Sequence, residues 1–154
     1  SIPNFLIDEN NIDDVNDILN DLLRKEAMMI QEFQDKIVTY GEVSLIMFSE
    51  NYSHAVRKKA KSGDFRVQDD HGGTLHDHDA SDEEILFAQA CLKACPVLPS
   101  YARVDLFYDN NGKIALGELE LIEPELWFRR RPESAVLFAN ELKKVYDFHS
   151  GDHS

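Results

Sequence analysis

Charged side chains recur at alternate positions within Tyr101–Glu125, in a pattern that could hold a metal ion. Alternation of polar and apolar residues at the start of this stretch places Arg103 and Asp105 on one face of a strand. Asn111-Gly112 is typical of a hairpin turn, because a type I′ turn needs positive φ at both central residues. The stretch therefore predicts a β-hairpin that carries chemically useful side chains on one face.

The turn also determines which residues of the hairpin face each other. With those two residues as the loop, Asp105 lies opposite Glu118 and Arg103 lies opposite Glu120. Three carboxylates this close would repel each other by roughly 1 kcal/mol per pair even in water. Hard oxygen ligands without a nearby His or Cys favour Mg²⁺ or Mn²⁺ over zinc. The pattern predicts a magnesium-like site, and the alternative is a solvated hairpin face with a cross-strand Arg–Glu pair.

Composition narrows the class of protein. The chain has 154 residues, of which 43% are hydrophobic and 29% are charged, as expected for one globular domain with a hydrophobic core. Its net charge of −13 argues against nucleic acid or an anionic membrane as a partner, since both need a basic surface. An anionic ligand would therefore be held by local basic residues or by a metal ion.

Other features of the chain bear on its location. No apolar run approaches the length of a membrane span, and the first ten residues lack the basic and apolar regions of a signal peptide. With only Cys91 and Cys95, a disulfide framework is not expected and a reduced, cytoplasmic setting is. The chain does not begin with Met, so we expect it to be a fragment of a longer protein.

Hydrophobic periodicity predicts the elements that must position the hairpin. Helical spacing begins at residues 12, 81 and 132, and Ser81 with Glu84 forms a capping box. The last helix is expected to begin at Pro132 and to bury an apolar side. Strands are predicted over residues 27–33, 42–48 and 52–58 and in the two arms of the hairpin. This order predicts an α+β protein with a largely antiparallel sheet flanked by helices, in a single domain over residues 1–154.

A long polar segment over residues 60–80 is predicted to be a loop, and loops of this length in compact domains are usually functional or disordered. Basic residues, among them Lys58 and Arg66, precede Gly72-Gly73. The backbone N–H groups of paired glycines can cradle phosphate oxygens, and the basic side chains could grip a phosphate. The alternative is an ordinary solvated loop.

Four segments in this order resemble the C-terminal part of ATP-grasp ligases. They are MIQEF, GEVSLIMF, KAKSGDFRVQDDHGG and YARVDLFYDNNGKIALGELELIEP. The third segment resembles the loops of glutathione synthetases and ribosomal-protein glutamate ligases, and the hairpin also resembles D-alanine–D-alanine ligases. The resemblance runs from about residue 28 to residue 145 and implies the ATP-grasp C-terminal lobe as the fold.

The resemblance also implies a role for each matching residue. For the nucleotide, it implies adenine binding by Glu32 and Phe33 and a contact near the ribose for Glu42. It implies contacts near the phosphates or the acyl acceptor for Lys58 and Arg66, and a mobile closing loop at Gly72 and Gly73. It implies transition-state stabilisation by Arg103 and metal ligation by Asp105, Glu118 and Glu120. Many relatives carry Asn where this chain has Glu120, so the site here carries one more negative charge.

The implied activity is an ATP- and Mg²⁺-dependent (or Mn²⁺-dependent) ligation of a small-molecule carboxylate to an amine or another nucleophile through an acyl-phosphate. The N-terminal lobe and the first nucleotide-binding strand pair of such enzymes are not visible in this sequence. We therefore expect a C-terminal fragment that works with the missing lobe and is inactive alone. It would fold as a monomer or pair with a second copy.

Two other functions remain open from the sequence. His71, His76 and His78, with Asp77 and Asp79, could form a transition-metal module, because histidines and carboxylates at such spacing can bind zinc. A non-catalytic interaction domain with an ATP-grasp shape is the other alternative.

Overall fold

The computed structural model describes residues 6–60 and 73–151. It divides the chain into two compact units, Ser1–Phe33 and Gln34–Ser154. The first unit contains helix α1 (Ile12–Leu23), which begins one turn after Asp8 and carries Asp13 and Asp14 in its first turn. Acidic residues there interact favourably with the positive end of the helix dipole.

The prediction of a strand over residues 27–33 is wrong, because this segment has no regular secondary structure. Met29 is 86% exposed and Ile30 is 71% exposed. A strand needs a neighbour that pairs with its backbone, and no strand is present among the described residues of the first unit. Its apolar residues alone could not predict that outcome.

The second unit is built on an antiparallel five-stranded sheet with the strand order β3-β2-β1-β4-β5. The strands are β1 (Glu42–Phe48), β2 (Asn51–Lys59), β3 (Thr74–His78), β4 (Tyr101–Tyr108) and β5 (Ile114–Glu120). Strand β3 lies within the segment that was predicted to be a loop. It is a short, mostly exposed edge strand, and such a strand carries little of the hydrophobic pattern that reveals strands in a sequence.

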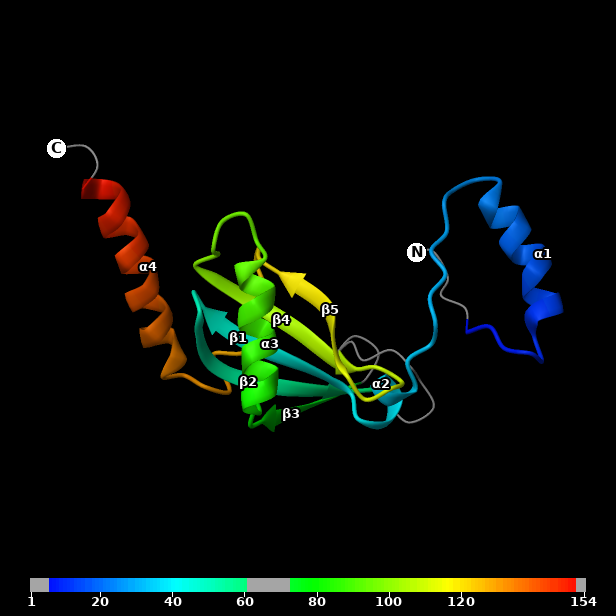
Figure 1. Ribbon diagram of the computed structural model, residues 1–154, viewed down its shortest axis with the longest axis horizontal. Coiled ribbons are helices and arrows are strands. Elements are labelled where there is room, and N and C mark those ends of the chain that lie inside the picture. The colour runs from blue at the N-terminus through cyan, green and yellow to red at the C-terminus, as the bar shows by residue number, and fades with distance from the viewer. Residues whose placement is uncertain (1–5, 61–72, 152–154) are drawn as a thin grey trace. The chain divides into compact units, whose positions relative to one another are not determined.

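Helix α3 (Asp82–Lys93) covers one face of the sheet (Figure 1). The predicted capping box is present: Glu84 N–H donates to Ser81 Oγ at 3.2 Å, and Ser81 N–H donates to Glu84 Oε2 at 2.8 Å. Ala88 and Leu92 of this helix pack on the apolar residues of β1 and β4 to form the larger core cluster. This cluster fixes the orientation of β4, and therefore which of its side chains point to the opposite face.

The opposite face carries a smaller apolar cluster built from Ile46, Phe48 and Val56 with Leu126 and Trp127. Short helix α2 (Asp35–Thr39) lies beside the end of the β4–β5 hairpin, where Asp35 N–H donates to the Asn110 side chain at 3.0 Å. None of the helices in the described ranges is long and apolar enough to cross a membrane.

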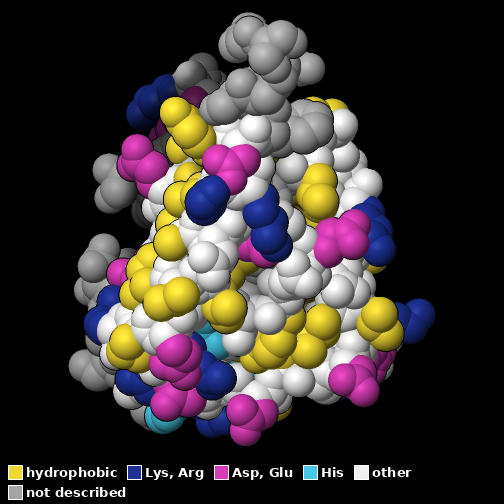
Figure 2. Space-filling model, turned by 90° about the vertical axis from the view of Figure 1, so that its left-hand side faces the viewer, with side chains coloured by type: hydrophobic (Ala, Val, Ile, Leu, Met, Phe, Trp, Pro, Cys, Tyr) yellow, Lys and Arg dark blue, Asp and Glu magenta, His cyan; other side chains and the backbone are white. Residues whose placement is uncertain are grey.

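Helix α4 (Ser134–Gly151) lies at the left of Figure 1 and begins two residues later than predicted. Its predicted apolar side is only partly buried. Phe138 packs against Phe48 with ring centroids 5.2 Å apart, whereas Val136 is 64% exposed and Tyr146 is 73% exposed. Figure 2 shows apolar side chains at the surface between acidic and basic ones on this side of the molecule.

Candidate active site

The β4–β5 hairpin has the predicted facing pairs, but its turn is longer than predicted. Its turn runs from Asp109 to Lys113 rather than through two residues, and the Asp109 N–H donates to the Lys113 carbonyl at 2.8 Å. Asp109 Oδ1 also accepts hydrogen bonds from the N–H groups of Asn111 and Lys113. An Asp side chain that bonds its own backbone in this way stabilises a longer turn.

A β-bulge at Gly117 then restores the register. Leu106 pairs with Leu116, whereas Asp105 pairs with Glu118, so Gly117 is the extra residue. A Cβ at Gly117 would lie 3.3 Å from the Asp105 carbonyl oxygen, so glycine suits this close approach. The predicted pairings of Asp105 with Glu118 and of Arg103 with Glu120 are therefore confirmed.

Arg103 pairs with the three carboxylates of the hairpin. Its Nε donates to Asp105 Oδ1 at 2.9 Å and its Nη2 donates to Asp105 Oδ2 at 2.8 Å, which is a bidentate pair. Arg103 Nη1 lies 2.9 Å from Glu120 Oε2, and Nη2 lies 3.8 Å from Glu118 Oε2. Burial alone would lower the pKa of the guanidinium, but Asp105, Glu120 and Glu118 together raise that pKa. Arg103 is therefore held in its charged form.

Lys58 extends this network to β1 and β2. Its Nζ lies 3.3 Å from Asp105 Oδ2 and pairs closely with Glu42. Burial raises the pKa of the Glu42 carboxyl; Lys58 opposes this rise and the charge of Asp105 adds to it. We call the six residues so connected the charge cluster. They are Glu42, Lys58, Arg103, Asp105, Glu118 and Glu120.

The charge cluster has the donors that a hard divalent cation requires. When all are ionised, its four carboxylates exceed its two cations by two charges, which one divalent ion would balance. No three potential ligands among the described residues surround a common point, however, because Arg103 lies between the carboxylates. The residues therefore fit such an ion in charge and donor type, and Arg103 would have to shift for it to bind.

Two residues beside the charge cluster were missed by the sequence reasoning. Ser44 pairs with Asp105 across β1 and β4, is fully buried, and its Oγ has no hydrogen-bond partner among the described residues. Trp127 places its ring near Arg103 and Lys58. Ser44 shares its strand face with Glu42, so its polarity within an apolar strand was a usable signal. For Trp127 the sequence offered no signal, because a loop brings it there.

Of the other predicted site residues, only Gly73 is a described residue of the unit that contains the charge cluster. Glu32 and Phe33 belong to the first unit, so adenine binding by them stays a prediction. Arg66 and Gly72 lie outside the described residues, and Gly73 is a half-buried residue that immediately precedes β3. The predicted closing loop is therefore not described by the structure.

The alternative zinc module finds no support among the described residues. Within the residues that the structure describes, no three His, Cys, Asp or Glu side chains are arranged as a metal site. His76 Nε2 lies 2.9 Å from Thr74 Oγ1, and His78 Nε2 lies 3.0 Å from the buried Glu84 carboxylate. Asp77 instead accepts a hydrogen bond from Arg130 Nε at 2.6 Å. His71 lies outside the described ranges.

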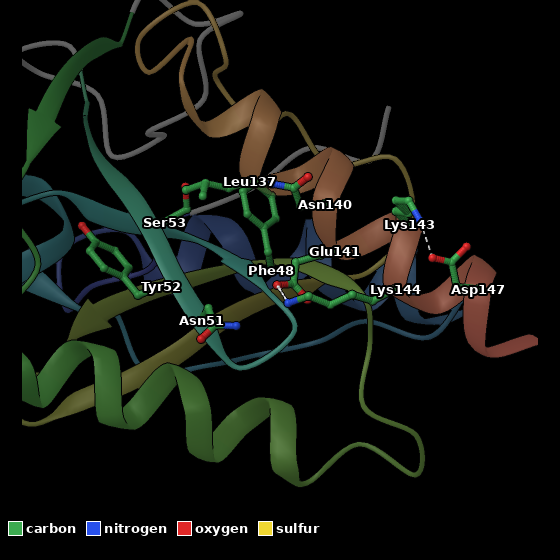
Figure 3. A pocket seen from close by; sticks show the side chains of 10 residues that line it. All are labelled: Phe48, Asn51, Tyr52, Ser53, Leu137, Asn140, Glu141, Lys143, Lys144 and Asp147. Carbon is green, nitrogen blue, oxygen red and sulfur yellow. Dashed lines mark hydrogen bonds and ion pairs between the residues drawn. The ribbon is translucent and has the colours of Figure 1, made fainter.

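A cavity of about 640 Å³ lies elsewhere, between α4 and the turn that joins β1 to β2 (Figure 3). Figure 3 shows Phe48 pointing toward α4, and a dashed line joins Lys143 to Asp147. Lys144 pairs with Glu141 on the same helix. The charged groups in its lining thus have partners already, and none of the charge cluster lines this cavity.

Comparison with known protein families identifies the family of this chain. The family profile described as RimK-like ATP-grasp domain matches residues 5–120, which is well over half of the chain. The chain belongs to this ATP-grasp family. All six residues of the charge cluster lie within the matched range, whereas Trp127 lies beyond it.

Two solved structures resemble the chain. The crystal structure of D-cycloserine synthetase DcsG is 27% identical, with a TM-score of 0.60 over 74% of this chain. D-alanine–D-alanine ligase from Bacillus anthracis, complexed with ATP, is 13% identical, with a TM-score of 0.52 over 96% of this chain, and supports the α+β ATP-grasp fold. The chain spans 41% and 56% of their respective lengths. No curated protein matches it by sequence.

Proposed function

We propose that this ATP-grasp chain forms the nucleotide- and metal-binding part of a ligase that uses ATP to join a carboxylate to an amine or another nucleophile. The observation that carries the proposal is the bidentate Arg103–Asp105 pair, which lies on the sheet face with Glu118, Glu120 and Lys58 around it. Membership of the ATP-grasp family and the ATP named in the structure of its D-alanine–D-alanine ligase relative support the nucleotide.

The reaction has two steps. A carboxylate oxygen of the substrate attacks the γ-phosphorus of ATP, the bond to the bridging oxygen breaks, and ADP leaves from the resulting acyl-phosphate. The amine then attacks the carbonyl carbon, a C–N bond forms, the C–O bond to phosphate breaks, and the amine loses a proton. Mg²⁺ or Mn²⁺, when bound, would neutralise phosphate charge during the first step.

The charge cluster supplies the groups that this chemistry needs. Lys58 offers a point charge for a phosphate oxygen, and Glu118 and Glu120 are the accessible carboxylates for an ion. Arg103 is charged and nearly buried, so it is suited to stabilise the oxyanion that forms in the second step. The two substrates, a cytoplasmic setting and a further lobe that would complete the site are part of the same proposal.

Binding of ADP to the purified chain, measured by titration calorimetry with and without Mg²⁺, tests the proposal. We expect Mg²⁺-dependent binding that weakens about tenfold or more in Glu118→Gln, because a charged ligand contact is worth at least 1.4 kcal/mol. Glu50→Gln is the matched control, since Glu50 is an exposed carboxylate outside the charge cluster. Absence of ADP binding at millimolar concentration, or equal affinity in wild type and Glu118→Gln, would contradict the proposal.

A further inference from the structure

Trp127 is the single tryptophan of the chain, and its ring lies against both cations of the charge cluster. Arg103 Cζ lies 5.4 Å and Lys58 Nζ lies 5.9 Å from the ring centroid. A cation within about 6 Å of an aromatic face is attracted to it, and Trp attracts most strongly. Trp127 is only 3% exposed, so water screens this attraction little. One ring thus contacts the two side chains that bind Asp105.

The backbone at Trp127 adopts a conformation that large residues avoid. Its φ is 46°, in the left-handed region. The N–H of Trp127 donates to Glu125 Oε1 at 2.7 Å, and its carbonyl accepts from the N–H of Arg130 at 2.8 Å. Burial would raise the pKa of Glu125, but the hydrogen bond from Trp127 and the pairing with Arg129 lower that pKa, so Glu125 stays ionised. Strain held in place in this way is typical of functional positions.

Neighbouring contacts fix the same segment to the sheet. The Leu126 carbonyl accepts a hydrogen bond from His54 Nε2 of β2 at 3.0 Å, in a buried position. Arg130 Nε donates to Asp77 of β3. The segment is therefore attached to two strands, which leaves the Trp127 ring a defined place over the sheet.

The indole N–H of Trp127 is buried without a hydrogen-bond partner among the described residues. A buried donor without a partner is unfavourable, and a Phe or a Leu at this position would avoid it. Two unfavourable features therefore coincide at one residue, the strained backbone and the unpaired donor. A leucine could fill the apolar volume, but only an aromatic ring presents a face to Arg103 and Lys58.

We propose that Trp127 is a positioning residue whose ring holds the Arg103 and Lys58 side chains against Asp105. Through Arg103 it keeps the guanidinium directed at the sheet face where acyl transfer would take place. The link to acyl transfer rests on the proposed ligase function, whereas the positioning itself concerns the ligand-free chain.

Solvent exchange of the Arg103 Nε–H, followed by ¹H–¹⁵N NMR of the ligand-free chain, tests this proposal. The signal is assigned by its loss in Arg103→Lys. We expect exchange about tenfold faster in Trp127→Leu, because one buried cation–π contact is worth roughly that factor. Trp127→Phe keeps a weaker ring face and should fall between the two. Phe128→Leu is the matched control, since Phe128 packs on Phe138 instead of on the cations.

Unchanged exchange in a folded Trp127→Leu variant would overturn the proposal. If that variant does not fold, the comparison of wild type with Trp127→Phe decides: the Arg103 Hε chemical shift must move when the indole ring current is replaced, and an unmoved shift overturns the proposal. In a second experiment the chain is titrated with ADP and Mg²⁺ while tryptophan fluorescence is recorded. We expect ADP binding to change the emission of Trp127. If ADP does not bind at all, the proposed function fails, and the NMR result on positioning still stands.

Discussion

Arg103 donates hydrogen bonds to both carboxylate oxygens of Asp105, which lies two positions further along strand β4. Both are buried, so water screens the attraction between their charges little. A ligand that needs either group must therefore compete with the other. A phosphate that bound Arg103 would free Asp105 for a divalent ion. A divalent ion that bound Asp105 would in turn free Arg103 for a phosphate.

Replacement of Asp105 by Asn should destabilise the fold far more than replacement of Glu118 by Gln. Asp105 is fully buried, and its loss leaves Arg103 and Lys58 without their shared carboxylate. Breaking a buried ion pair of this kind destabilises by about 3 kcal/mol. The Glu118 side chain is 59% exposed, so Glu118→Gln should change the free energy of unfolding by less than about 0.5 kcal/mol. Urea unfolding measures both, and similar losses in the two variants would be inconsistent with the buried pair.

Two glycines of the hairpin should respond differently to alanine. Gly112 has a φ of 79°, so Gly112→Ala strains the turn by about 1 kcal/mol but leaves the charge cluster in place. At Gly117 the new Cβ would press on the Asp105 carbonyl oxygen and disturb the pairing with Glu118. We expect only Gly117→Ala to weaken Mg²⁺-dependent ADP binding, in calorimetric titrations run beside unfolding curves. Weaker binding in both variants would show that the bulge has no special role.

Much of the hairpin and of the sheet could be predicted from the sequence, because Glu42–Phe48 is a short, mostly apolar run and Tyr101–Tyr108 begins with alternating polar and apolar residues. The prediction of a two-residue turn was wrong, since the hydrogen bonds of Asp109 favour a longer turn. The predicted register was still correct beyond the bulge, because Gly117 shifts the pairing by one residue. Short-range patterns report such local pairings well.

The remaining errors concern contacts between distant parts of the chain. An apolar segment such as residues 27–33 does not reveal whether a paired neighbour exists for it. The position of Trp127 over Lys58 depends on a loop held by His54, and no periodicity describes that loop. Four members of the charge cluster were grouped in advance because they lie on one hairpin, whereas the contacts of Lys58 with Glu42 and Asp105 were not predicted.

Glu84 should control the ionisation of Tyr108 on the α3 side of the sheet. Burial, then the charge of Glu84 and the hydrogen bond to it, raise the pKa of Tyr108 to about 12. Glu84→Gln keeps a capping-box residue at the start of α3 but removes the charge, so the pKa should move back toward 10. Ultraviolet titration of tyrosinate measures this shift, and an unchanged titration in Glu84→Gln would contradict the assignment.

The same interaction predicts an alkaline loss of stability. The folded pKa of Tyr108 is raised above its unfolded value of 10.0, so its contribution is complete below that pH and is lost as the pH rises toward 12. The free energy of unfolding should therefore decline less steeply above about pH 10 in Tyr108→Phe than in wild type. Parallel declines in the two proteins would show that Tyr108 does not contribute.

Protonation of His54 should destabilise the segment that carries Trp127. Burial lowers the pKa of His54 from 6.5, and Arg131 lowers it further, whereas the Leu126 carbonyl, Glu133 and Asp77 oppose this shift. Because the unfolded chain binds the proton first, stability is lost as the pH falls below 6.5 toward the folded pKa. Glu84 and Glu125, whose pKa values are lowered from 4.5, act in a more acidic range.

His54→Gln separates this effect from the other histidines. Gln can still donate to the Leu126 carbonyl but does not titrate, so the free energy of unfolding should fall less between about pH 7.5 and about pH 5.5 than in wild type. His76→Gln is the control, because His76 is an exposed histidine on β3 whose ring pairs with Thr74 rather than with the Leu126 carbonyl. Urea unfolding at both pH values gives the comparison. If His54→Gln loses as much stability on acidification as wild type does, a different group is responsible for the acid sensitivity.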